Sequence, residues 1–232
     1  MKKIRFLSSL LFTLSLIMLL PSNSKAWHDE THIAIAKVAG YAKWYNAAGA
    51  DIARVKAGKI EGHNHYRNNP FGTVVTPEMV LEQTEKYNQI EDDGHLYGAI
   101  IASFRDYIEY IKIGKFGENH FAYCVHYIGD LSQPLHNTLY NHFNREHHQA
   151  IDGIINAEVL ENLQQIKIYP IKIDSEEDLA REIARLANIS INLGYKIEKE
   201  NRLLSKGEAY TQIGHSASLL KAVLDYVEKI TK

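Results

Sequence analysis

The sequence from residue 126 to residue 136 reads His126-Tyr-Ile-Gly-Asp130-Leu-Ser-Gln-Pro134-Leu-His136. His126 and Asp130 are four residues apart, so on a helix both side chains would project from the same face. Pro134 is expected to end or bend that helix, which lets His136 approach from another direction. Helices that present imidazole and carboxylate groups in pairs are suited to zinc, which takes nitrogen and oxygen ligands. The stretch therefore predicts a helical protein built around metal.

A second pair of the same kind follows in His148-Gln-Ala-Ile-Asp152, on what should be the next helix. One such pair is common by chance, and a single histidine on a helix face is usually a packed or surface residue. Here, however, five of the 12 histidines fall between residues 126 and 148, within an otherwise apolar segment. Buried charges need partners or metal. The clustering favours a metal site over coincidence.

Residues 126 to 136 closely resemble the core motif of a family of trinuclear-zinc phosphodiesterases. This family includes bacterial zinc-dependent phospholipases C and single-strand-specific nucleases. The match covers eleven consecutive positions, with both histidines and the aspartate in place. The resemblance implies a single compact multi-helix domain wrapped around three zinc ions.

Carried over position by position, the resemblance implies nine metal ligands. The first zinc would be held by Asp51, His65, His126 and Asp130, the second by His136, His148 and Asp152, and the third by Trp27 and His32, with Asp130 bridging to the first. Trp27 would bind through its amino nitrogen and carbonyl oxygen once it is the N-terminal residue. His28, Glu61 and His63 compete for these roles but fit the family spacing less well.

The same resemblance implies hydrolysis of a phosphate ester by in-line attack of hydroxide, without a covalent enzyme intermediate. Two neighbouring zinc ions lower the pKa of a shared water, and a third neutralises the phosphate and the leaving oxygen. Asp51 is the residue expected to orient or deprotonate that water.

Two residues beside these ligands are candidates for substrate binding. Arg54, one helical turn after Asp51, is placed to hold a phosphate oxygen, although an exposed arginine is an equal alternative. Tyr66 would stack on a base, cover the metals, or contact a choline headgroup.

The substrate is therefore expected to be a phospholipid, with release of its phosphorylated headgroup as in phospholipase C. The absence of disulfides and the acidic charge favour that branch. The short spacing from Trp27 to His32, Arg54, and Asp rather than Glu at position 152 favour the alternative, a single-strand-specific nuclease or 3'-nucleotidase. A third hypothesis is an exported zinc-binding helical protein without catalytic activity.

Residues 1–26 are predicted to be a signal peptide. Lys2, Lys3 and Arg5 form the basic start, residues 7–20 form the apolar core, and Ser24-Lys-Ala26 provides small residues for cleavage. A membrane anchor is the alternative, but the apolar run is short for a span of about 20 residues. Cleavage after Ala26 would leave one domain, residues 27–232, in a periplasm or outside the cell.

The net charge indicates which kinds of molecule the protein would bind, and the cysteine content indicates how its core is built. The chain has 26 basic and 28 acidic residues, and its signal segment carries basic residues only, so the processed protein is acidic. An acidic protein is not expected to bind duplex nucleic acid, whereas a small substrate is compatible with this charge because bound zinc ions would make the site itself positive. Peripheral contact with a membrane is a further expectation. Cys124 is the sole cysteine and is predicted to be a buried core residue. A monomer is expected.

The rest of the chain reads as further helices, which makes the fold class all-α. Thr76-Pro77-Glu78 should begin a helix that reaches about Gln89, and the helix that carries Asp152 should continue to Leu163. Ser175 should cap a helix to about Leu193, and the last helix should span residues 209–230. His95 and His215 are expected to be structural.

Overall fold

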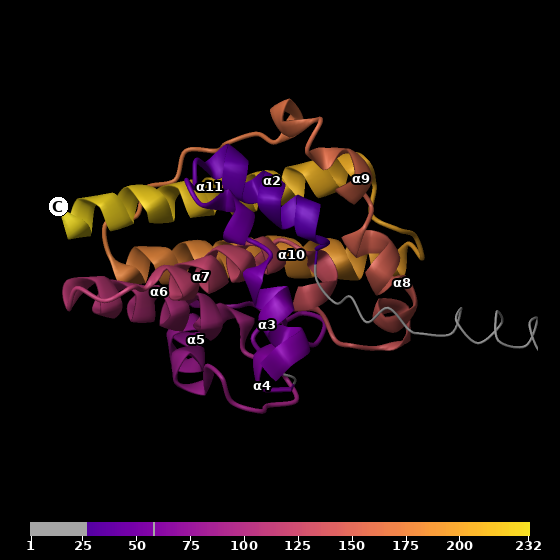
Figure 1. Ribbon diagram of the computed structural model, residues 1–232. Helices are drawn as coiled ribbons and strands as arrows, with labels where there is room; N and C mark the ends of the chain where they lie inside the picture. The colour runs from indigo at the N-terminus through magenta and orange to yellow at the C-terminus, as the bar shows by residue number, and fades with distance from the viewer. Residues whose placement is uncertain (1–26, 58) are drawn as a thin grey trace, which may run out of the picture.

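The computed structural model describes residues 27–57 and 59–232, and all regular structure in these residues is helical (Figure 1). The elements in chain order are α2 (Asp29–Ala39), η2 (Trp44–Asn46), α3 (Gly49–Ala57), α4 (Lys59–Gly62), α5 (Pro77–Glu82), η3 (Gln83–Lys86), α6 (Leu96–Lys112), α7 (Glu118–Leu131), η4 (Pro134–Asn137), α8 (His142–Asp152), α9 (Asn156–Val159), η5 (Leu163–Gln165), α10 (Glu176–Lys199) and α11 (Lys206–Thr231). The all-α prediction is confirmed for these residues. The predicted signal peptide, residues 1–26, lies outside them. Of the helices described, none has the length and apolar character needed to cross a membrane.

Helix α7 lies at the centre of the fold. It packs against α6, α10 and α11, while α3 and α2 also contact it (Figure 1). Every residue from Cys124 to Leu131 on α7 is buried. Each fully buried Leu or Ile side chain stabilises the fold by about 1.5–3 kcal/mol, so this helix holds its polar residues in fixed positions.

Cys124 is part of this core, as predicted. Burial raises the pKa of its thiol to about 12, so the thiol stays protonated at neutral pH. Its role is packing.

Two of the predicted helix starts are confirmed by their capping bonds. The Thr76 hydroxyl accepts a hydrogen bond from Met79 N at 3.4 Å, and the Ser175 hydroxyl accepts one from Asp178 N at 3.1 Å. These bonds satisfy backbone donors that have no partner inside the helix. The helix that begins after Ser175 runs to Lys199, beyond the expected end near Leu193.

Two of the predicted helix ends are wrong. The helix after Thr76 changes to 3-10 geometry at Gln83 and stops at Lys86, two residues before Asn88 takes up a left-handed conformation with φ 60°. The helix that carries Asp152 ends at that residue instead of continuing to Leu163.

The early end of α8 has a tertiary cause. The carbonyl of Asp152 accepts a hydrogen bond from His28 N at 3.4 Å, so the N-terminal segment occupies the place of the next helical turn. Gly153 makes this approach feasible, because a Cβ there would lie 3.1 Å from the His28 ring. Packing between distant segments therefore sets this boundary.

Candidate metal centre

Helix α7 places His126 and Asp130 one turn apart on its buried face, as their spacing predicted. His126 Nε2 lies 3.3 Å from Asp130 Oδ2. His126 Nδ1 lies 2.8 Å from the carbonyl oxygen of Ala47. Burial would lower the pKa of His126, but Asp130 and Asp51 raise it to about 9. Because a carbonyl can only accept, Nδ1 keeps its proton, and Nε2 is the atom that would give up a proton to bind a metal.

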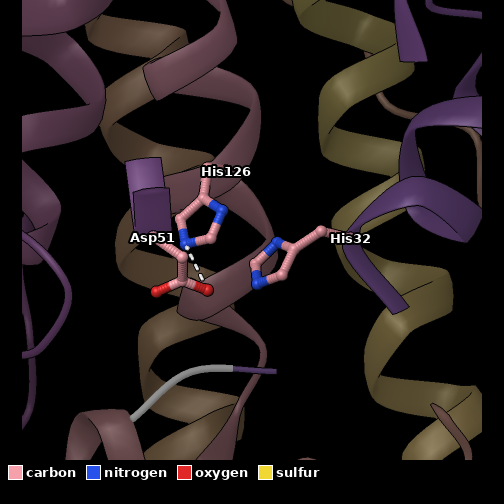
Figure 2. Close-up of side chains that lie close together, drawn as sticks. All are labelled: His32, Asp51 and His126. Atoms are coloured by element: carbon pink, nitrogen blue, oxygen red, sulfur yellow. Dashed lines mark ion pairs between the residues drawn. The ribbon is translucent and has the colours of Figure 1, made fainter. Parts of the chain in front are cut away.

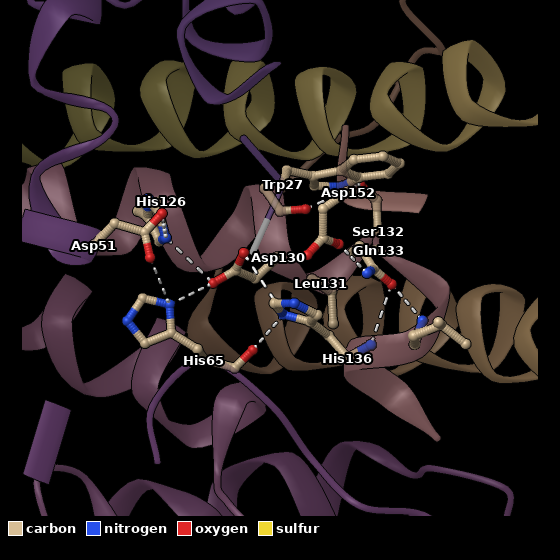
Figure 3. Close-up of polar contacts among 12 residues, drawn as sticks. Trp27, Asp51, His65, His126, Asp130, Leu131, Ser132, Gln133, His136 and Asp152 are labelled. Atoms are coloured by element: carbon tan, nitrogen blue, oxygen red, sulfur yellow. Dashed lines mark hydrogen bonds and ion pairs between the residues drawn. The ribbon is translucent and has the colours of Figure 1, made fainter. Parts of the chain in front are cut away.

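Asp130 is fully buried and lies among four histidines, of which Figure 3 shows His65, His126 and His136. Besides His126, its carboxylate is approached by His65 Nδ1 at 2.9 Å, His32 Nε2 at 3.4 Å and His136 Nδ1 at 3.6 Å. Burial alone would raise the pKa of Asp130, but the neighbouring His126 and His136 outweigh it and hold the pKa well below its usual value. Asp130 is therefore ionised and placed to bridge two cations.

His65, His126 and Asp130 form the first group of ligand atoms, all within 4.8 Å of one another. Asp51, on α3, adjoins this group, with Oδ1 4.0 Å from His65 Nδ1 and Oδ2 3.8 Å from His126 Nε2. The four residues predicted for the first zinc therefore lie together in space. They come from α3, the segment after α4, and α7.

His32, Asp51 and His126 form a second group of the same dimensions (Figure 2). The His32 ring stacks on the His126 ring, with centroids 3.8 Å apart and an interplanar angle of 13°. Gly129 permits this contact between α2 and α7, because a Cβ there would lie 2.4 Å from His32 Nδ1. Burial, followed by the nearby His126, lowers the pKa of His32, which keeps the ring neutral and able to bind a cation.

His136, His148 and Asp152 form the third group. Pro134 begins the 3-10 turn η4 after α7 has ended, and this turn brings His136 to face α8. His148 Nε2 lies 3.4 Å from Asp152 Oδ2, and the two histidine rings stack with centroids 5.0 Å apart. Burial lowers the pKa of His136 to about 4, so its ring is neutral at pH 7. The three residues predicted for the second zinc thus lie together.

Trp27 lies at the Asp152 end of the centre (Figure 3). Its side chain is fully buried, and its indole Nε1 donates to Ser132 Oγ at 3.3 Å. The next residue, His28, bonds through its main chain to the Asp152 carbonyl, and its ring packs on Gly153. The structure therefore brings Trp27 beside Asp152, while His32 lies against Asp51 and His126.

Three residues outside the predicted ligand set hold these ligands in place. The Gln133 side chain donates to Asp152, Asn144 Oδ1 lies 2.6 Å from His148 Nδ1, and Glu61 Oε1 lies 3.5 Å from His65 Nε2. Asn144 precedes His148 by four residues, so helical spacing carried a signal for it. Glu61 precedes His65 by the same four residues, whereas nothing in the sequence assigns such a role to Gln133.

The donor set fits zinc. Several buried side-chain atoms of the three groups make no hydrogen bond to any residue that the structure describes; among them are His32 Nε2, His65 Nε2, His126 Nε2, Asp130 Oδ1, His136 Nε2 and Asp152 Oδ2. Buried polar atoms normally have partners, and zinc is bound by imidazole nitrogens and carboxylate oxygens at about 2.0–2.2 Å. An ion within each group would satisfy these atoms, apart from His65 Nε2, which faces Glu61.

Arg54 points toward the centre. Its Nη2 lies 3.0 Å from Asp51 Oδ1, and its side chain is only 16% exposed. The alternative of an exposed arginine is therefore wrong, and Arg54 lies next to the first and second groups of ligands.

Tyr66 lines a pocket of about 170 Å³ that opens beside the third group. The pocket is bounded by Tyr66, Asn68, Asp92, Leu135, His136, Tyr140, Asn144 and His148. The Tyr66 hydroxyl is 2.9 Å from His63 Nδ1 and donates to the Asp92 carbonyl at 3.3 Å. These bonds fix the tyrosine at the pocket wall, within the same cavity as His136 and His148.

Neither a comparison with protein-family models nor a search of curated proteins found a match for this chain. The described residues form an all-α protein in which histidine and aspartate side chains lie close enough together to hold a metal ion.

Proposed function

We propose that this chain is an exported zinc-dependent phosphodiester hydrolase. The observation that carries the proposal is the set of three adjoining His and Asp groups, of which the first two share His126. Five histidines in a buried site favour zinc over magnesium or calcium, which prefer oxygen ligands. Zinc ions held this way would activate a water for attack and neutralise the charge on a phosphate ester.

Asp51 is the residue best placed to handle the proton of that water. Its carboxylate faces both His65 and His126, and its side chain is 15% exposed. Burial would raise the pKa of Asp51, but His126, His65 and Arg54 together lower it below its usual value. Asp51 is therefore ionised at neutral pH and acts as a hydrogen-bond acceptor or base.

Arg54 would bind the phosphate. Its guanidinium is held beside the centre by Asp51, and a guanidinium forms strong paired hydrogen bonds with phosphate oxygens.

A phospholipid is the leading substrate, cleaved to release its phosphorylated headgroup. The pocket beside His136 and His148 has tyrosine side chains in its wall, Tyr66 and Tyr140, and aromatic faces attract ammonium headgroups. The second candidate is a single-stranded nucleic acid or nucleotide, because the same rings would stack on a base.

Parallel hydrolysis assays would test the proposal. Zinc-loaded protein beginning at Trp27 is mixed with phosphatidylcholine dispersions and, separately, with single-stranded oligonucleotides. Chelated protein and an Asp130→Ala variant are the controls. Release of phosphocholine that both controls lose supports the phospholipase, and cleavage of the oligonucleotide supports the nuclease. Zinc binding without hydrolysis of either substrate would overturn both assignments in favour of a non-catalytic zinc-binding protein.

A further inference from the structure

Glu61 is a buried carboxylate that the proposed chemistry does not use. It is only 5% exposed, although ionised side chains are rarely buried without a purpose. Its Oε1 accepts a hydrogen bond from Tyr127 Oη at 2.5 Å, and its Oε2 accepts one from Asn64 Nδ2 at 3.0 Å. Oε1 also lies 3.5 Å from His65 Nε2.

His65 is oriented differently from the other histidines of the first and third groups. In His126, His136 and His148, Nδ1 is bonded to a neutral oxygen, which belongs to Ala47, His65 and Asn144 respectively. Their Nε2 atoms are therefore left to face the centre. In His65 the arrangement is reversed, since Nδ1 faces Asp130 at 2.9 Å and Nε2 faces Glu61.

Glu61 cannot reach the ions that His65 would bind. The two nitrogens of an imidazole lie on opposite sides of the ring, so the His65 ring separates Glu61 from Asp130. Its direct contact with the predicted ligands is the one to His65.

We propose that Glu61 is a positioning residue for the metal centre: its carboxylate, with Oε1 3.5 Å from His65 Nε2, draws the ring proton to that nitrogen and leaves the Nδ1 lone pair for the metal. This inference rests on the metal centre proposed above. A carboxylate beside one ring nitrogen makes the other nitrogen a more basic metal ligand than a neutral carbonyl would. Residues that hydrogen-bond to a metal ligand in this way tune the metal affinity of the site.

The effect of Glu61 extends beyond one ligand. The carbonyl oxygen of His65 lies 2.6 Å from His136 Nδ1, so the placement of His65 also sets the tautomer and direction of a ligand in the third group (Figure 3). Tyr127 and Asn64 hold the carboxylate from the far side, which fixes its direction toward His65.

The test compares zinc binding by wild type, Glu61→Gln and Tyr127→Phe, each beginning at Trp27, with a competing chelator and with metal analysis. Glu61→Gln removes the negative charge and places an amide N–H against a donor. Tyr127→Phe removes one bond to Glu61 but keeps the carboxylate and the ring. We expect Glu61→Gln to bind at least one zinc about 10–100-fold more weakly. Tyr127→Phe keeps the carboxylate and its bond from Asn64, so it should lose less zinc affinity than Glu61→Gln, although it should lose thermal stability.

Nitrogen-15 NMR of the His65 ring in zinc-loaded wild type provides a second measurement that needs no variant. We expect a protonated Nε2 and a metal-bound Nδ1. If Nε2 binds the metal, or if wild type and Glu61→Gln have equal zinc affinities, the proposed role of Glu61 is overturned while the proposed metal centre stands. If wild type binds no zinc, the metal centre itself is overturned, and the role of Glu61 with it.

Discussion

Gln133 and Asp152 are joined by a buried hydrogen bond from the glutamine amide to the carboxylate (Figure 3). The Oε1 of the same glutamine accepts from the backbone N–H groups of Leu135 and His136. One side chain therefore connects the turn after α7 to the end of α8. It fixes two members of the third ligand group although it is not a ligand itself.

Replacing Gln133 should weaken both stability and metal binding. Gln133→Ala leaves buried groups without partners, which costs about 1–3 kcal/mol, and frees Asp152, which should lower zinc affinity by about 10–100-fold. Urea denaturation and chelator competition measure the two effects. Gln212→Ala is the matched control, because Gln212 is equally buried but bonds to Ser132 O and Ser190 Oγ. Similar zinc affinity in the two variants would contradict this role.

Asp130→Asn should abolish the centre while keeping its shape. Four histidines approach this carboxylate, and an uncharged amide offers neither the charge nor the bridging oxygens that two cations need. We expect metal analysis to show loss of more than one zinc per chain, and phosphodiester hydrolysis to fall at least about 100-fold. Retention of the full zinc content in Asp130→Asn would show that this carboxylate does not bridge ions.

Removal of the metal should lower the stability of the wild-type protein far more than it lowers the stability of the Asp130→Asn variant. A ligand that binds only the folded state stabilises it by about 2.7 kcal/mol at one hundred times its Kd. Thermal unfolding with and without chelator measures the stabilisation by bound zinc. Zinc added back to the wild-type protein should restore its Tm. An unchanged Tm for wild type in chelator would count against a resident metal.

Tyr66 should contribute to substrate binding through its ring. Tyr66→Ala removes the ring from the pocket wall, whereas Tyr66→Phe removes only the hydroxyl that bonds to His63 and to the Asp92 carbonyl. Loss of stacking costs about 1–3 kcal/mol, so Tyr66→Ala should raise KM by about 10–100-fold with unchanged zinc content. Tyr66→Phe should remain close to wild type. An equal rise of KM in both variants would assign the effect to the hydroxyl.

His95 should make the metal-free protein less stable in acid. Burial lowers its pKa to about 4, below the ordinary value of 6.5, so the unfolded chain binds a proton that the folded chain does not. This contribution to stability is therefore lost as pH falls from about 6.5 to about 4. We expect the urea midpoint in chelator to drop between pH 7 and pH 5 by less in His95→Gln than in wild type. His95 Nε2 lies 2.7 Å from Asn64 Oδ1, and the glutamine amide can still donate there. An identical drop in the two proteins would refute the assignment.

Features that depend on local spacing could be predicted from the residues alone. The pairs His126 with Asp130 and His148 with Asp152 are each four residues apart, and helix geometry alone puts each pair on one face. Pro134 ends the first of these segments because it lacks an N–H and restricts the residue before it. The helical class follows from the same periodicity.

Which of these groups meet depends on how the helices pack against one another. His32 reaches Asp51 and His126 because Gly129 lets α2 approach α7, and His65, from the segment after α4, lies with Nδ1 2.9 Å from Asp130 Oδ2 on α7. The end of α8 at Asp152 is likewise set by a hydrogen bond from His28. Helical periodicity constrains neighbours within one turn, whereas contacts between segments far apart in the chain depend on how whole helices pack.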